Sequence, residues 1–159
     1  MTSRADFEPG EWDLLVQAPR WVVAAASAAQ RDLAYRTDHE IEAGYVATAK
    51  GSISENAFVT GVAAETMKIF DSRTVVGATD FADRAAGVSA VLERVASAAR
   101  LLAEKAQPAD AEAYGRWLLE ITEVVITAAR SKDILGFGGQ LVTEKERDFR
   151  ERLAQTLRP

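Results

Sequence analysis

One short stretch of the chain has residue types and spacing that could do metal chemistry. Asp38, His39 and Glu42 lie between positions 38 and 42. Residues three and four positions apart share a helix face, so these side chains could hold one divalent cation if another helix added ligands. The alternative is that these acidic residues only stabilise the helix, because the helix macrodipole favours acidic side chains in the first turn. A di-iron carboxylate centre is excluded, because it needs two Glu-x-x-His motifs and the chain has one histidine.

The composition excludes most other kinds of catalytic and metal-binding site. There is no cysteine, so disulfides, thiolate metal sites and cysteine nucleophiles are excluded. With His39 as the one imidazole, no Ser-His-Asp arrangement can be assembled from the sequence with any support. The sequence therefore predicts a protein that is not an enzyme and needs no cofactor.

The charge balance and the most apolar run bear on partners and location. The chain holds 19 basic and 24 acidic residues, a net charge of −5, whereas nucleic-acid binders depend on cationic contacts to phosphates. The residues after Met1 are acidic rather than basic and apolar, unlike a signal peptide. The run from Leu14 to Ala29 contains Gln17, Pro19 and Arg20 and is shorter than a membrane span. We therefore expect a cytoplasmic protein that binds neither nucleic acid nor membrane.

The sequence pattern predicts helices along most of the chain. Strand alternation and hairpin turns such as Asn-Gly are nearly absent, and the length of 159 residues fits one domain. The helical segments are expected at residues 11–30, 37–50, 52–70, 79–106, 108–130 and 143–157. The predicted fold is an all-α, single-domain bundle of about five to six helices over residues 1–159, in which residues 1–10 form a flexible N-terminus.

Local signals predict where these segments begin and break. Three capping boxes, each a Ser or Thr followed three positions later by Glu, are Thr37 with Glu40, Ser52 with Glu55, and Thr143 with Glu146. Pro19 should break the first segment into a short helix ending at Ala18 and a longer one starting at the proline, because proline lacks the amide donor.

Two long segments carry matching apolar faces. In 79–106 two seven-residue repeats form an a/d stripe: Val88, Val95 and Leu102, with Ala85, Leu92, Ala99 and Ala106. In 108–130 one face collects Tyr114, Trp117, Leu118, Ile121, Val125 and Ala128. We expect the two segments to form a central antiparallel hairpin, with an Arg116–Glu120 ion pair on the outside. The stripe of 79–106 would equally suit a dimer interface, and the face offered by 108–130 favours the intramolecular seam.

The glycine-rich turn at Gly136–Gly139 precedes a capped helix. A loop of this kind can present amide groups to a phosphate. The Lys-Ser/Thr pair and preceding strand of a P-loop are missing, so we interpret the turn as a tight connection between helices.

The three tryptophans differ in their expected roles. Trp117 falls on the apolar face of its segment and is expected in the core. Trp12 and Trp21 are candidate contacts for a partner or for a second copy, and an exposed Trp12 would indicate such a contact.

Two stretches of the chain carry a resemblance to a known group of proteins. They are Trp12-x-x-Leu15-x-x-Ala18-Pro19-x-x-Val22, and Trp117-Leu118-Leu119-x-Ile121 followed by Leu135-Gly136-Phe137-Gly138-Gly139 and Val142-Thr143-x-x-Glu146. Together they resemble a family of small, functionally uncharacterised bacterial all-helical proteins, which is itself similar to the tellurite-resistance TerB-like domains.

The resemblance implies acidic residues at helix starts that bind metal. In TerB-like domains these residues often form an Asp-Gly followed by Glu. Here no Asp-Gly follows the first helix, and the nearest acidic cluster is Asp38, Glu40 and Glu42, with Glu144 and Glu146 as the later counterpart.

Two functions therefore remain as hypotheses. The first is a non-enzymatic helical bundle that acts through protein–protein contacts, with a protein partner or as a homo-oligomer. The alternative is a TerB-like domain that binds a divalent metal or a small ligand at the acidic turn of residues 38–42.

Overall fold

The computed structural model describes residues 1–29, 34–71, 83–128 and 143–158, with the side chains of 34–38 and 71 left out. Regular structure in these ranges is entirely helical, which confirms the predicted all-α bundle. Six α-helices follow one another: α1 (Pro9–Ala28), α2 (Ala34–Lys50), α3 (Ala57–Asp71), α4 (Arg84–Lys105), α5 (Pro108–Ala128) and α6 (Glu144–Thr156). Two short 3₁₀ turns, η1 (Arg4–Asp6) and η2 (Gly51–Ile53), complete the described elements.

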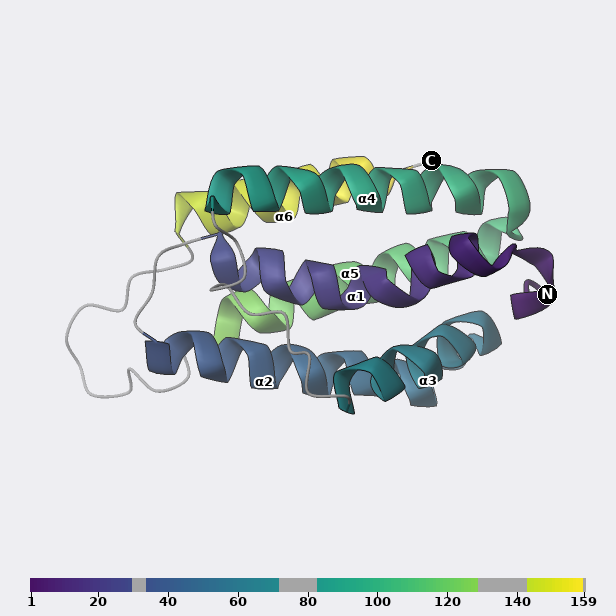
Figure 1. The fold of residues 1–159 in the computed structure, drawn as a ribbon, viewed down its shortest axis with the longest axis horizontal. Helices are drawn as coiled ribbons and strands as arrows, with labels where there is room; N and C mark the ends of the chain where they lie inside the picture. Colours follow the sequence, from purple (N-terminus) through teal and green to yellow (C-terminus); the bar gives the residue numbers. More distant parts are fainter. Residues whose placement is uncertain (30–33, 72–82, 129–142, 159) are drawn as a thin grey trace.

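The helices form three layers of two (Figure 1). α1 and α5 make the middle layer, α4 and α6 cover one side, and α2 and α3 cover the other. α4 and α5 are joined by a short turn and run antiparallel, as expected. At the centre of the bundle, however, α5 lies beside α1, which contacts every other α-helix.

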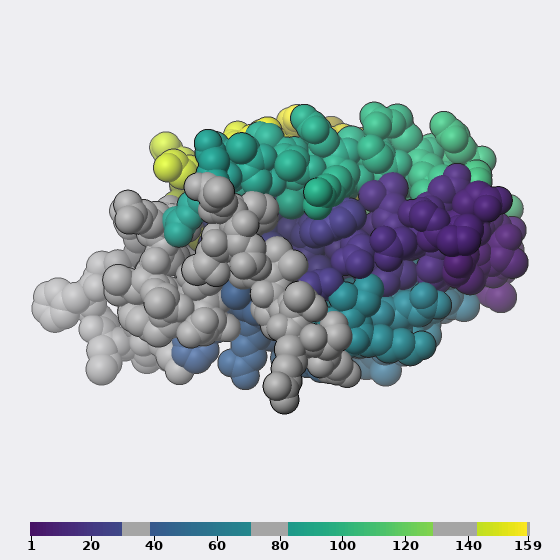
Figure 2. Space-filling view, viewed as in Figure 1, coloured from purple at the N-terminus to yellow at the C-terminus, as the bar shows by residue number. Residues whose placement is uncertain are grey.

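The composition of α1 explains its central place. Every residue from Val22 to Ala28 is buried, and most of them are alanine. Small side chains let neighbouring helices approach closely on several sides at once. In the view of Figure 2, α1 reaches the surface between α4 and α3.

Pro19 does not break α1, contrary to the prediction. The helix runs through it, and the proline ring is buried. Proline cannot donate to the carbonyl four residues earlier, which is that of Leu15. The buried hydroxyl of Tyr114 on α5 donates to that carbonyl oxygen instead, at 2.8 Å. The hydroxyl of Thr66 on α3 donates to the next carbonyl, that of Val16, at 2.9 Å. Two neighbouring helices thus support the backbone that the proline opens.

Helix starts agree with one of the three predicted capping boxes. Thr143 and Glu146 make the reciprocal pair that begins α6, as predicted. The box at Thr37 is wrong, because α2 begins at Ala34 and Thr37 lies inside it. The box at Ser52 is also wrong: residues 51–53 form η2, and Asn56 caps α3 by accepting a hydrogen bond from the Val59 amide at 3.0 Å.

The apolar stripe of α4 lies within the molecule, chiefly against α1. Leu92, Val95 and Leu102 are buried as predicted, whereas Ala85 is exposed. Burial also includes Val91, Ala98 and Leu101, which the seven-residue repeat left out. A straight helix drifts about 20° per heptad against a strict seven-residue repeat, so the buried stripe moves across the predicted one.

Two of residues 1–10, Thr2 and Phe7, are buried against the bundle, and the flexibility of this segment stays a prediction. The amide of Thr2 donates to Oδ2 of Asp110 at 2.7 Å, and the amide of Gln107 donates to the Thr2 hydroxyl at 2.8 Å. The side-chain amide of Asn56 donates to the other oxygen of Asp110 at 2.8 Å, and Phe7 is buried in the core. Asp110 therefore ties the N-terminal residues to the starts of α3 and α5.

No helix in the described ranges is both long and apolar enough to span a membrane.

Candidate functional site

The candidate site is the solvent-facing side of α2, on which the acidic turn continues into apolar residues. We call this surface the outer face of α2. Its described members are spaced three and four residues apart, so they lie on one side of the helix and its 3₁₀ extension. They are His39, Glu42, Tyr45, Val46, Lys50 and Ile53.

The opposite side of α2 holds the helix against the bundle. Apart from Glu40, its described buried residues are small: Gly44, Ala47 and Thr48. A Cβ atom at Gly44 would lie 2.6 Å from a methyl carbon of Val23 on α1 and 3.0 Å from one of Val125 on α5. Real contacts of this kind are longer, so only glycine lets α2 approach both helices this closely.

Two large apolar residues point outwards, Val46 on α2 and Ile53 on η2. Tyr45 is only partly exposed, because its ring lies edge-on against Phe70 of α3 with the ring centroids 5.5 Å apart. Val46 is 50% exposed, Ile53 is 85% exposed and Tyr45 is 37% exposed. In the described ranges the one other large hydrophobic residue exposed to this degree is Met1. Val46 and Ile53 therefore leave apolar surface exposed to solvent on this side of the molecule.

The acidic turn brings together two of its three predicted metal ligands. His39 Nδ1 lies 3.7 Å from Glu42 Oε2, and the Glu42 side chain is 76% exposed. Asp38 is part of α2, but its side chain lies outside the described residues. Within the described ranges no three acidic or histidine side chains are grouped so that they could hold a metal ion. The metal site stays a prediction.

Glu40, beside the acidic turn in sequence, lies on the other side of the helix. Its side chain is buried, as is that of Arg20 on α1. The Arg20 guanidinium lies 5.8 Å from the ring centroid of Phe70, and it donates to Oε1 of Gln17 at 3.1 Å. Burial lowers the pKa of Arg20 from its ordinary value. These two charged groups belong to the interior of the bundle rather than to the outer face of α2.

The tryptophans separate into core and surface. Trp12 is 5% exposed, and its indole N–H donates to Oε2 of Glu65 at 2.8 Å. Trp12 therefore lacks the exposure that would have indicated a partner contact, and its ring packs in the core. Trp117 is in the core as predicted, against Gly51. Trp21 is half-buried beneath the guanidinium of Arg94, at 4.6 Å from the ring centroid, and its role as a contact stays a prediction.

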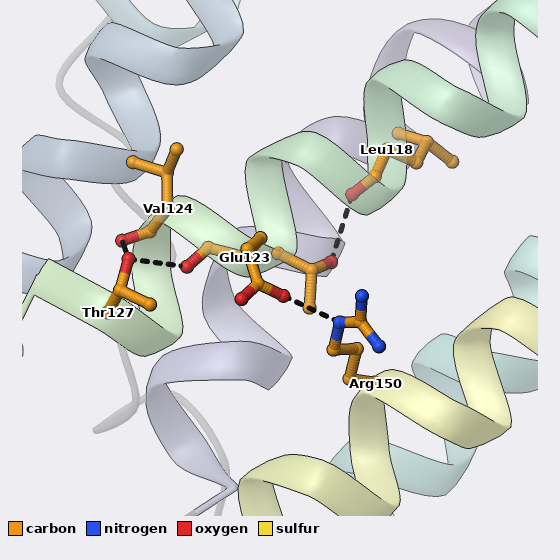
Figure 3. Close-up of polar contacts among 6 residues, drawn as sticks. Leu118, Glu123, Val124, Thr127 and Arg150 are labelled. Atoms are coloured by element: carbon orange, nitrogen blue, oxygen red, sulfur yellow. Dashed lines mark hydrogen bonds and ion pairs between the residues drawn. The ribbon is translucent and has the colours of Figure 1, made fainter. Parts of the chain in front are cut away.

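Charged side chains also meet between α5 and α6, where they join helices (Figure 3). Arg150 Nε donates to Oε2 of Glu123 at 2.5 Å. On α5 itself, Thr127 donates to the carbonyl of Glu123 at 2.7 Å. Arg116 pairs with Glu112 at 3.3 Å, so the predicted pairing with Glu120 is wrong. The Glu123–Arg150 pair joins α5 to α6, and the other two contacts lie within α5.

The glycine-rich turn at Gly136–Gly139 lies outside the described residues. The interpretation of this turn as a tight connection between helices, rather than as a phosphate-binding loop, stays a prediction.

Sequence reasoning pointed to the acidic turn and missed the apolar residues beside it. The signal was the spacing of Glu42, Val46 and Lys50, which follow one another at intervals of four residues. The residues between them include the small residues of the inner side of the helix. The sequence alone does not show which side of α2 is buried, so it cannot distinguish Val46 and Ile53 from core residues.

Comparisons of the chain with models of protein families, with curated proteins and with solved structures found no match.

Proposed function

We propose that this protein acts through protein–protein contacts made by the outer face of α2, and that it does not catalyse a reaction. The observation that carries the proposal is the exposure of Val46 on α2 and of Ile53 on η2, while the buried side of α2 is built, apart from Glu40, from small residues. Burying apolar surface is the main favourable term in most protein association, at roughly 25 cal/mol per Å² removed from water.

The spacing of the exposed residues supports a contact in which this helix packs against a helix or into a groove of the partner. Helices that dock on partners present apolar anchors at spacings of three, four and seven residues. Val46 and Ile53 are seven positions apart, and Glu42 and Lys50 flank Val46 with opposite charges. An apolar centre with a charged rim is the usual composition of a protein interface.

Photo-cross-linking in the cells that make the protein would test this function. A photoreactive phenylalanine derivative placed at Val46 or Ile53 should give a defined cross-linked protein product. The same residue at Ala90, which is exposed on α4, is the matched control and should give none. Equal labelling at all three positions, or none at Val46 and Ile53, would overturn the proposal.

A second candidate function is divalent-metal binding in the manner of TerB-like domains, by Asp38, His39 and Glu42. The observation that favours it is the approach of His39 to Glu42 on an exposed face. A cation bound only by the folded state should raise the melting temperature. Replacing Asp38 and Glu42 together by alanine should remove that rise. An unchanged melting temperature with millimolar calcium, magnesium or zinc would reject this function.

We place both functions in the cytoplasm as part of the same proposal. Fractionation of the producing cells, with an antibody against the protein, tests the location directly.

A further inference from the structure

The charges on the outer face of α2 are arranged symmetrically about Val46. Glu42 lies four residues before it and Lys50 four residues after it, and all three side chains are exposed. Residues four apart form the ridges by which helices pack against one another. Ala43 and Ala49, half-buried and three residues on either side of Val46, flank this ridge with small side chains.

Reversing the direction of α2 about Val46 exchanges opposite charges. In an antiparallel pair centred on Val46, position 42 of one helix faces position 50 of the other, and position 43 faces position 49. Each carboxylate of Glu42 would then meet an ammonium group of Lys50, and alanine would meet alanine. In a parallel pair like charges would oppose each other, which is unfavourable.

We propose that the occupant of the outer face of α2 is a second copy of this chain, packed antiparallel about a two-fold axis at Val46. This inference rests on the proposed function, because it names the partner for the same surface. A two-fold contact uses one self-complementary patch, and every interaction in it is made twice. Ile53 of each copy comes beside His39 of the other, which covers the most exposed apolar side chain of the face.

The size of the patch sets the expected strength. A contact made chiefly by one helix from each copy falls at the small end of specific interfaces, so we expect a dissociation constant on the order of micromolar. The two Glu42–Lys50 pairs would be exposed at the rim, so higher salt should weaken the dimer.

Sedimentation equilibrium on the full chain, from about one to several hundred micromolar, tests the inference. Glu42→Lys and Lys50→Glu should each raise the dissociation constant about ten-fold or more, because each places like charges opposite one another. The double variant exchanges the two charges and should return to within about three-fold of the original value. A mixture of the two single variants should form a heterodimer, since both of its charge pairs are attractive.

Controls carry the same charge changes on the other side of the molecule. Glu93→Lys on α4 and Lys145→Glu on α6, both exposed, should leave the dissociation constant within about two-fold. Val46→Asp, also at an exposed position, should abolish the dimer while circular dichroism shows an unchanged helical fold.

Two results would overturn the second copy as occupant. One is a monomer at every concentration, and the other is a dimer that the charge variants do not change. Neither result removes the proposed function, which photo-cross-linking of Val46 to a different protein would support independently.

Discussion

The two faces of α2 reverse the usual distribution of residue size. The inner face has Gly44, Ala47 and Thr48, where a helix of a bundle ordinarily places its large apolar side chains. The outer face has Val46 and Ile53 exposed to solvent. Close packing requires glycine at position 44, because α1 and α5 lie too near for a larger residue there. Folding gains little from the large apolar residues outside, which are exposed, and the proposed contact with another molecule rests on them.

The interior of the bundle differs from the outer face of α2, because several of its polar groups are paired with residues from other parts of the chain. Pro19 deprives the Leu15 carbonyl of its helical donor, and Tyr114 on another helix supplies one. Asp110 accepts from both Thr2 and Asn56 across three parts of the chain. Inside the molecule, side chains are committed to neighbouring helices, whereas the outer face of α2 offers apolar surface to solvent.

The largest expected effect is at the closest approach of α2. Gly44→Leu should lower the free energy of unfolding by about 3 kcal/mol or more, because its side chain would overlap Val23 and Val125. The matched change on the other face, Val46→Leu, should alter it by less than about 0.5 kcal/mol. Urea unfolding followed by circular dichroism measures both. Similar losses for the two variants would mean that the faces do not differ as described.

The second effect concerns the buried hydroxyl of Tyr114. Tyr114→Phe should cost about 2 kcal/mol, because the Leu15 carbonyl loses its donor in a buried position. Pro19→Ala restores an amide donor to that carbonyl within α1. Tyr114→Phe should therefore cost about 1 kcal/mol less in the Pro19→Ala background. Equal costs in the two backgrounds would show that the proline does not create the need for Tyr114.

Periodicity predicted the helices well because it depends on burial along one chain segment. The face of α5 from Tyr114 to Val125 is buried as predicted, and α6 begins at its predicted capping box. Periodicity does not say which helices are neighbours. The sequence therefore placed the α4–α5 hairpin at the centre and could not show that α1 lies beside α5 there.

Errors arose where a distant residue changes a local preference. The break predicted at Pro19 assumed that the Leu15 carbonyl would stay without a donor, and Tyr114 lies 99 positions away. The hydrogen bond from the Thr2 amide to Asp110 likewise joins residues far apart in the sequence, so no local pattern could predict it. The outer face of α2 needs the same long-range information, because close packing at Gly44 decides which side of the helix is buried.

A third, smaller effect depends on pH. Burial by itself would raise the pKa of Asp110, but hydrogen bonds from Thr2 and Asn56 outweigh it, so the pKa lies below its ordinary value of 3.8. A carboxyl with a lowered pKa contributes stability above its unfolded pKa and loses it as pH falls through the folded one. We expect Asp110→Asn to cost about 1 kcal/mol at neutral pH, and less as pH falls below 3.8. Urea unfolding at several pH values measures this, and a pH-independent cost would contradict it.

The smallest expected change in stability is at Val46, and it separates the two faces most clearly. Val46→Ser removes apolar surface that is already half in water, so the free energy of unfolding should change by less than about 0.5 kcal/mol. Val125→Ser makes the same change at a fully buried position and should cost several kcal/mol, at least about 2. The order should invert for association. Val46→Ser should weaken self-association and reduce cross-linking from Ile53 without any loss of fold. If Val46→Ser instead destabilised the monomer as Val125→Ser does, Val46 would belong to the core, and the exposed apolar surface of α2 would no longer call for a partner.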